Sequence, residues 1–189
     1  MCFKLKIFIK FTQQNINNQL LTKCNLKHFN ANVLMTRNII LKVKKFVDGD
    51  GLIVEDYLTK REFEIRLYGI DAPEMNYCNK IKKDEKELHL PAAFLIKLGY
   101  MSFEFLKSNV SIGDICTLVQ EKNNLQDKYG RSLGYLILND GRVLNEIMIK
   151  EGYAKPYNDV FCDMLPMYQE WNLEAKINLK GLYSVVNKF

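Results

Sequence analysis

Between residues 38 and 70 apolar and polar residues alternate, and this pattern constrains the fold more than any other feature of the chain. Ile39, Leu41 and Val43 are separated by single residues, so their side chains share one face of a strand. The segment Asp48-Gly49-Asp50-Gly51 then supplies a tight turn. Further strand patterns follow at residues 52–58 and 62–70. This part of the chain therefore predicts hairpins with one buried face.

The strand expected over residues 62–70 places the charged side chain of Arg66 on the face opposite the core. Phe63, Ile65 and Leu67 share one face, so Arg66 points to the other. The strand ends in the run from Ile70 to Glu74, because Pro73 lacks an N–H for the ladder and keeps the preceding residue out of helix. Residues 75–88 contain seven charged side chains and predict a charged surface loop.

The second half of the chain mixes helices and strands. Residues 92–107 are apolar at helical spacing, which predicts a mostly buried helix with Gly99 as a candidate break. The other expected elements are strands at 115–120 and 133–138, a turn at 139–141, and helices at 143–152 and 165–179. Five short strands with interspersed helices predict an α+β fold, mostly β, built on a small barrel.

Positive charge is concentrated at the N-terminal end. Residues 1–47 hold nine of the 27 Lys and Arg residues and no acid, so the remainder has 18 basic and 22 acidic groups and a net charge of −4. Residues 12–32 are rich in Asn and Gln and have no period. We therefore expect a loosely ordered basic extension over residues 1–36 and one domain over residues 37–189. Met35, at this boundary, is a candidate internal start.

Composition excludes several classes of site. The two histidines, His28 and His89, are 61 residues apart, which argues against a zinc site or a multi-histidine nuclease centre. Five cysteines without a C-x-x-C pair argue against a disulfide framework and favour a reducing compartment such as the cytoplasm. No apolar run approaches the roughly 18 residues of a membrane span, and neither a signal peptide nor a transit peptide is indicated.

Most of the candidate catalytic and metal-binding residues lie in three segments. These segments are Asp48-Gly49-Asp50, the run from Arg66 to Glu74, and Asp127-Lys128-Tyr129-Gly130-Arg131. Each is weak alone: the first is typical of a turn, and it cannot open an EF-hand because Leu52, Ile53 and Thr59 stand where that loop needs a ligand, a glycine and a bidentate Glu.

In this order and spacing, however, the three segments resemble the staphylococcal nuclease (thermonuclease) family, whose sequences read D-G-D-T, then R-L-x-G-I-D-x-P-E, then D-x-Y-G-R. The resemblance extends from about residue 43 to residue 182 and includes Leu144-Asn145-Glu146. It implies an OB-like five-stranded barrel with packed helices. It also implies a monomeric enzyme that cuts DNA and RNA with little sequence preference, with single-stranded or frayed strands preferred.

The resemblance implies one Ca²⁺ ion. Asp50 and Asp71 match the carboxylate ligands, and the backbone carbonyl of Ala72 and water molecules complete an oxygen set that suits Ca²⁺. Two carboxylates brought together repel each other, and a cation offsets that repulsion.

The remaining site residues follow from the same motifs. Glu74 matches the general base that activates the attacking water, and Arg66 and Arg131 match the two guanidinium groups that hold the scissile phosphate. Lys128 and Tyr129 match positions beside the 5′-phosphate of the bound nucleotide, and Tyr157 lies near the position at which the family stacks a base.

One departure keeps an alternative open. Gly51 replaces the family's Thr, so a hydroxyl that supports the metal site is absent. This feature favours a catalytically silent OB-fold module that binds nucleic acid or a peptide. A restriction-type nuclease using Asp84-Glu85-Lys86 fails on context, because that triplet lies in a charge-dense segment instead of on a buried strand.

Overall fold

The computed structural model describes residues 35–189, and side chains from residue 38 onward. The extension expected over residues 1–36 lies outside this part, apart from Met35 and Thr36. These two residues belong to the first strand, β1 (Met35–Phe46), which begins two residues before the expected boundary.

Five strands form a closed barrel in the order β1-β2-β3-β6-β5, as expected. The other four strands are β2 (Gly51–Asp56), β3 (Glu62–Leu67), β5 (Ile115–Glu121) and β6 (Ser132–Ile137). All neighbours are antiparallel except β3 and β6, whose parallel pairing closes the barrel. The apolar side chains of β1 and β3 fill its interior, and Leu41, Val43, Ile65 and Leu67 are completely buried.

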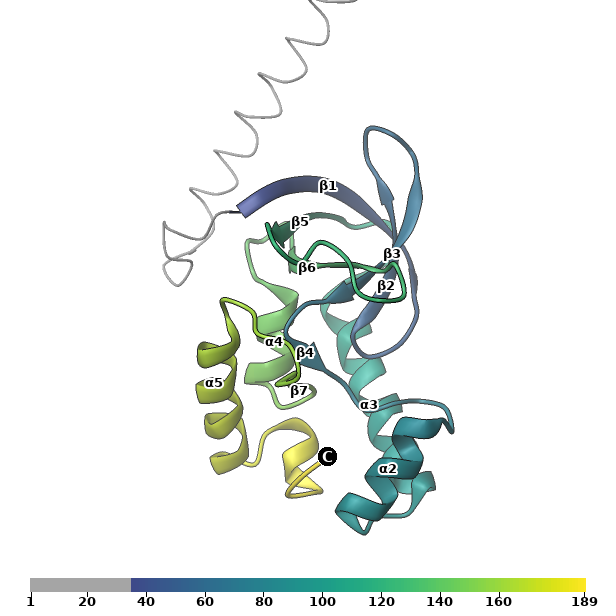
Figure 1. Ribbon diagram of the computed structural model, residues 1–189, viewed down its shortest axis with the longest axis vertical. Coiled ribbons are helices and arrows are strands. Elements are labelled where there is room, and N and C mark those ends of the chain that lie inside the picture. Colours follow the sequence, from purple (N-terminus) through teal and green to yellow (C-terminus); the bar gives the residue numbers. More distant parts are fainter. Residues whose placement is uncertain (1–34) are drawn as a thin grey trace, which may run out of the picture.

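The helices lie at one end of the barrel (Figure 1). They are α2 (Asn79–Leu88), α3 (Ala92–Asn109), α4 (Leu144–Lys150), α5 (Leu165–Ile177) and the 3₁₀ helix η1 (Gly181–Ser184). Two short strands, β4 (Ile70–Asp71) and β7 (Lys155–Pro156), pair with each other between the barrel and these helices. The mixed, mostly β fold matches the expectation from the sequence.

A buried asparagine joins the helices to the barrel. The side chain of Asn145 in α4 is fully buried; its Oδ1 accepts the N–H of Leu136, and its Nδ2 donates to the carbonyl oxygens of Tyr68 and Gly134. The buried amide thus accepts one hydrogen bond and donates two, so its polar atoms are satisfied without water. Asn145 thus ties α4 to β6 and to the residue that follows β3.

The expectation of a charged loop over residues 75–88 is wrong for most of its length, because Asn79–Leu88 form α2. One buried apolar residue docks this helix: Ile81 is 1% exposed and belongs to a second core cluster with Leu95 and Leu98 of α3. The charged side chains lie mostly toward solvent, where Lys83 and Glu87 form an i,i+4 ion pair. In the sequence, the seven charged residues therefore outweigh the apolar residue by which the helix packs on α3.

Helix α3 is also continuous, so the expected break at Gly99 does not occur. Gly99 is instead a point of close approach, because a Cβ there would lie 2.3 Å from the carbonyl oxygen of Glu74 and 2.9 Å from that of Pro73. The missing side chain lets the segment after β4 pack directly on the helix.

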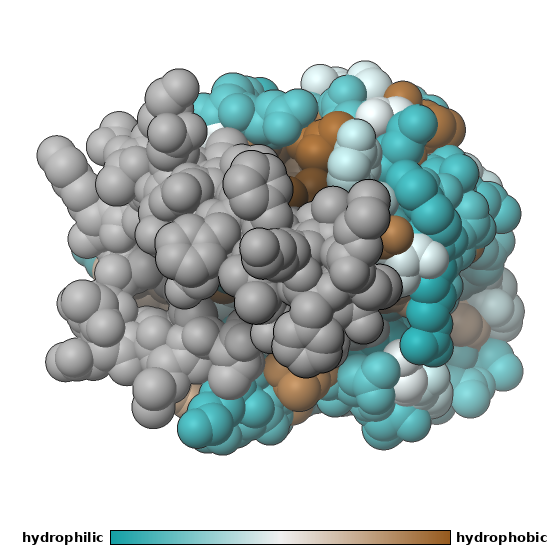
Figure 2. Space-filling model, turned by 90° about the horizontal axis from the view of Figure 1, so that it is seen from above, coloured by the Kyte–Doolittle hydropathy of each residue, from teal (hydrophilic) through white to brown (hydrophobic). Residues whose placement is uncertain are grey.

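Residues 35–189 contain no helix long and apolar enough to cross a membrane. The surface visible outside the grey atoms in Figure 2 is mostly hydrophilic, with separate hydrophobic areas. Within these residues Cys78, Cys116 and Cys162 form no disulfide.

We predict that Gly99→Ala lowers the free energy of unfolding, because the added methyl group overlaps backbone that cannot swing aside, at a cost of about 1–3 kcal/mol. The roughly 1 kcal/mol that Ala gains over Gly in a helix offsets part of this cost, so the expected net loss is up to about 2 kcal/mol. Urea unfolding measures the change. Lys97→Ala, at an exposed position of the same helix, is the control and stays within about 0.5 kcal/mol of the wild type. Equal or greater stability of Gly99→Ala would contradict the packing argument.

Candidate functional site

The turn between β1 and β2 positions Asp50 at the candidate site. The Oδ1 atom of Asp48 accepts the N–H of Asp50 at 3.0 Å, which holds the turn. A Cβ on residue 51 would lie 2.8 Å from that same Oδ1 atom. The Asp48 carboxylate therefore occupies the space that a side chain at Gly51 would need, and it stabilises the turn locally.

Arg66 bridges the two carboxylates that the sequence analysis singled out. Its Nη1 lies 2.5 Å from Oδ1 of Asp50, and its Nη2 lies 3.2 Å from Oδ1 of Asp71. The second oxygen of Asp50 accepts the N–H of Ala72 at 2.8 Å. Because Asp50 and Asp71 are only 3% and 6% exposed, these contacts replace the water that each carboxylate loses.

A left-handed turn delivers Asp71 to this position. Gly69 has a φ of 78°, and a Cβ on it would lie 2.5 Å from Sγ of Cys162. Both the backbone conformation and the available space therefore require glycine. The turn reverses the chain after β3, and pairing of Asp71 in β4 with Lys155 in β7 fixes its backbone.

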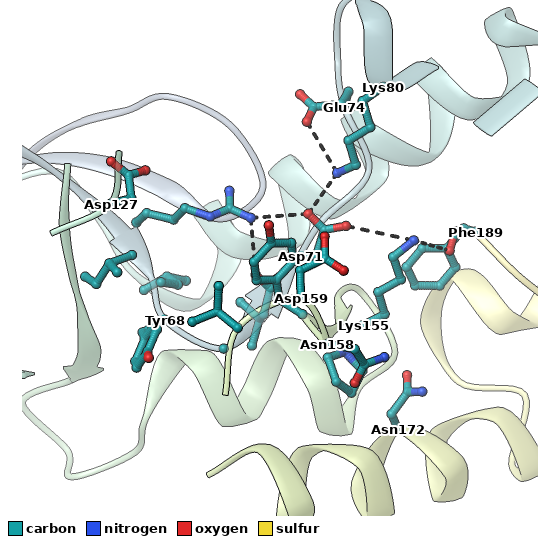
Figure 3. A pocket seen from close by; sticks show the side chains of 18 of the residues that line it. Tyr68, Asp71, Glu74, Lys80, Asp127, Lys155, Asn158, Asp159, Asn172 and Phe189 are labelled. Atoms are coloured by element: carbon teal, nitrogen blue, oxygen red, sulfur yellow. Dashed lines mark hydrogen bonds and ion pairs between the residues drawn. The ribbon is translucent and has the colours of Figure 1, made fainter. Parts of the chain in front are cut away.

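Two lysines reach Asp71 from different elements (Figure 3). The Nζ of Lys80, in α2, lies 2.8 Å from Oδ1 of Asp71, 3.2 Å from the carbonyl oxygen of Ala72 and 3.3 Å from Oε1 of Glu74. The Nζ of Lys155 lies 3.8 Å from Oδ2 of Asp71 and donates to the carbonyl oxygen of Phe189 at 2.7 Å. Three cationic groups thus surround the acidic cluster.

Burial and neighbouring charges act in opposite directions on the ionisable groups of the site. Burial raises the pKa of Asp50 to about 7, although the Arg66 guanidinium lowers it. Burial lowers the pKa of Lys155 more than Asp71 raises it. Lys80 behaves in the opposite way: burial lowers its pKa, but the combined effect of Asp71 and Glu74 is larger and leaves the pKa above its usual value.

The third motif forms a separate loop on the same side of the barrel. Oδ1 of Asp127 accepts the N–H groups of Tyr129 and Arg131, and its Oδ2 accepts a hydrogen bond from Nε of Arg131 at 2.8 Å. Tyr129 is 73% exposed, and the cationic groups of Lys128 and Arg131 lie 5.0 and 5.7 Å from its ring centroid. Asp127 therefore sets the conformation of the loop and the direction of Arg131.

These groups border one open groove of about 1020 Å³. Its lining contains eight basic and six acidic side chains, so it carries a net positive charge although residues 48–189 together are net negative. Arg66, Arg131 and Tyr157 all line it, and the Tyr157 ring centroid lies 5.7 Å from Cζ of Arg66. A positive groove lined by tyrosine rings suits a polyanion whose bases can stack.

The oxygen atoms of the site fit a hard cation. Asp71, Ala72 and Glu74 each direct one oxygen at the Lys80 ammonium, which shows that the three converge on a single positive charge. Among residues 35–189, no three Asp, Glu, Cys or His side chains form a compact metal cluster. A metal ion here would therefore also use the Ala72 carbonyl and water, which Ca²⁺ accepts readily.

The tertiary structure brings together most residues that the sequence singled out. Asp71, Glu74, Arg66 and Arg131 line the groove with Lys128, Tyr129 and Tyr157, while Asp50 lies behind it in contact with Arg66. Sequence reasoning gave no role to three further residues, Lys80, Lys155 and Asp127. Asp127 opens a quoted motif and has the signature of an Asx turn, but neither lysine stands out among its neighbours in the sequence.

Comparison with known proteins gives one family. The family described as "Staphylococcal nuclease homologue" matches residues 64–185, a range that contains Arg66, Asp71, Glu74 and Arg131 but not Asp50. An uncharacterized protein of Methanocaldococcus jannaschii is 27% identical over 189 residues, which cover 95% of this chain and 88% of that protein.

Two further relatives carry functional names. An uncharacterized endonuclease of Escherichia coli O157:H7 is 31% identical over 144 residues, which cover 76% of each chain. The thermonuclease of Staphylococcus intermedius is 26% identical over 141 residues, which cover 72% of this chain and 73% of that protein.

We predict a pH dependence that arises at Asp50. Its pKa is raised from 3.8 in the unfolded chain to about 7 in the folded protein. The folded state therefore keeps the proton longer, and this group makes the free energy of unfolding fall as pH rises between those two values, by at most about 1.4 kcal/mol per pH unit. Asp50→Asn lacks this titration, so the stability of the variant relative to the wild type increases up to about pH 7 and then levels off. Urea unfolding in chelator across this range measures it. A difference that does not change with pH would contradict the assignment.

Proposed function

The chain belongs to the staphylococcal nuclease homologue family, and we propose that it is a calcium-dependent nuclease that hydrolyses phosphodiester bonds of DNA and RNA with little sequence preference. One observation carries the proposal: Arg66, Arg131, Asp71 and Glu74 line one positively charged groove, and Asp50 lies behind it in contact with Arg66. These are groups suited to phosphodiester cleavage. The same groove is complete within one chain, which supports action as a monomer.

Calcium is the proposed cofactor. Asp71 and the carbonyl oxygen of Ala72 would hold the ion with Asp50 and water, since the first two oxygens converge on the Lys80 ammonium and the Asp50 carboxylate accepts the N–H of Ala72. When bound, the ion would polarise a phosphate oxygen and lower the pKa of water. Asp50 also has a positioning role, because it holds Arg66 through one oxygen and the Ala72 amide through the other.

The two arginines are the proposed phosphate ligands. Arg66 extends from β3, which is paired with β2 and β6, and is anchored by Asp50, while Arg131 is anchored by Asp127. Held in this way, each guanidinium can direct N–H groups at the phosphate with little loss of conformational entropy. The negative charge that develops on the phosphate in the transition state is therefore met by two preorganised cations.

Glu74 is the proposed general base. Its side chain is 36% exposed and lines the groove, so a water molecule can reach it beside the phosphate. Packing of its backbone on Gly99 fixes its position. A carboxylate in this position can accept a proton from that water molecule.

Lys128, Tyr129 and Tyr157 are the proposed nucleotide contacts. Lys128 and Tyr129 would lie beside the 5′-phosphate, and the Tyr157 ring would stack on a base. Because stacking on this ring requires a base outside the duplex, single-stranded or frayed nucleic acid is the preferred substrate in this proposal.

A catalytically silent module that binds nucleic acid or a peptide is the second candidate. Two features favour it: Gly51 lacks the hydroxyl expected beside the metal, and the Lys80 ammonium already contacts the oxygens that a metal would use. The cleavage assay described next separates the two candidates, because a silent module binds the strand without shortening it.

We predict that the protein shortens single-stranded DNA in the presence of Ca²⁺ and that excess EGTA stops the reaction reversibly. Asp71→Ala is inactive under both conditions, since it removes a ligand and a partner of Arg66. Gel electrophoresis of the products measures the activity. Undiminished cleavage in chelator would remove calcium from the mechanism, and binding without cleavage under all conditions would favour the silent module.

We also predict that Glu74→Gln lowers turnover by roughly two to four powers of ten, because the amide keeps the size of the side chain but cannot accept the proton. Nucleotide affinity stays within about tenfold of the wild type, since binding does not need the base. Steady-state kinetics with an oligonucleotide separates kcat from KM. Glu104→Gln, on the exposed surface of α3, is the matched control and keeps wild-type turnover. Wild-type turnover in Glu74→Gln would exclude Glu74 as the base.

A further inference from the structure

One cationic side chain in the site has no role in the proposed reaction. Lys80 directs its ammonium at an oxygen of Asp71, of Ala72 and of Glu74, with separations of 2.8, 3.2 and 3.3 Å. The first two oxygens belong to the proposed calcium ligands, and the third belongs to the proposed base. The same positive charge therefore contacts both parts of the site.

The position of Lys80 is built into the fold. It lies in the first turn of α2, next to Ile81, which is buried against α3. The end of α2 is held as well, because Oε1 of Glu85 accepts the N–H of Ala92 at the start of α3. Because α2 is held at both points, the fold places the Lys80 side chain at the site.

We propose that Lys80 is a tethered counter-cation that competes with the divalent cation for the same oxygens. An ammonium in contact with Asp71 and Ala72 and a metal ion bound to those atoms cannot coexist, because two positive charges would share one set of lone pairs. Lys80 occupies the oxygens when the divalent cation is scarce and withdraws when it binds. This inference rests on the proposed calcium site and adds a residue that sets the cation concentration at which the enzyme becomes active.

The side chain has room to withdraw. Lys80 is 31% exposed and lines the open groove, so rotation about its side-chain bonds moves the ammonium into solvent while α2 stays in place. Arg66 and Lys155 are less suited to this exchange. Arg66 is fixed by Asp50 at 2.5 Å, and Lys155 lies 3.8 Å from Asp71 and has a separate partner in the Phe189 carbonyl.

Competition has two measurable consequences. Without divalent cation, Lys80 compensates buried negative charge and stabilises the fold. With divalent cation, the contacts of Lys80 must first be broken, which weakens the affinity of the wild type. Removing the ammonium should therefore strengthen calcium binding and, in chelator, destabilise the protein.

The test is calorimetric titration of Ca²⁺ into the full-length wild type, Lys80→Met and Lys83→Met. Lys83 lines the same groove from the same helix but contacts only Glu87 among the ion pairs of residues 35–189, so it controls for the loss of one nearby charge. We expect Lys80→Met to bind Ca²⁺ roughly tenfold or more tightly than the wild type, since a charged hydrogen bond no longer has to be broken. Lys83→Met stays within about threefold, and the effect of Lys80→Met persists at about 0.5 M salt, where long-range effects are screened.

Thermal melting gives a second readout. In EGTA the melting temperature of Lys80→Met falls below that of the wild type, and in saturating Ca²⁺ the difference closes or reverses, because the bound cation stabilises the folded state. Lys80→Gln provides the same comparison if Lys80→Met does not fold.

The inference is overturned if the wild type binds Ca²⁺ and Lys80→Met and Lys80→Gln bind it no more tightly. In that case the proposed nuclease activity stands, and Lys80 is a structural brace. If no variant binds Ca²⁺ while the wild type still cleaves DNA, the calcium assignment fails and the inference fails with it. The two outcomes are therefore distinguishable.

Discussion

The contact of Arg66 with both Asp50 and Asp71 is the interaction on which the site depends. Two nearly buried carboxylates would repel each other and lose their hydration, and the guanidinium offsets both costs by contacting one oxygen of each. This bridge connects the turn after β1 to the strand β4, so it also joins the barrel to the separate two-stranded sheet. The bridge is possible because β3 is paired on both sides, by β2 and β6, which holds Arg66 on the outer face of a rigid sheet.

The helices complete the charge balance that the barrel leaves open. The barrel contributes Asp50 and Arg66, while α2 contributes Lys80 and the short strand β7 contributes Lys155. The site therefore lies where the barrel meets the helices, and its geometry depends on how closely these parts pack. Gly99 and Asn145 set that packing: the first allows direct contact between α3 and the backbone of Glu74, and the second fastens α4 to the barrel. Residues that serve the fold in this way also determine the accuracy of the site.

Much of this could be predicted from the sequence. Alternation in β1 and β3 identified the buried faces and placed Arg66 opposite them, and the turn signals at Asp48–Gly51 and residues 139–141 marked real chain reversals. The two errors have one physical cause. Helix α2 was mistaken for a loop because one buried Ile81 docks it, and Gly99 was mistaken for a helix break because its purpose is contact with a distant segment. In both cases tertiary packing outweighs the local pattern.

The sequence by itself determined the barrel strands, the membership of the nuclease family and the residues of the three motifs, because strand periodicity and motif spacing are local properties of the chain. Tertiary structure alone decided which charges face one another. Lys80 and Lys155 lie in unremarkable stretches of sequence, yet both contact Asp71, since the docking of α2 on α3 and the pairing of β4 with β7 bring them there. Electrostatic contacts of this kind depend on distances between segments remote in sequence, and only the packed fold sets those distances.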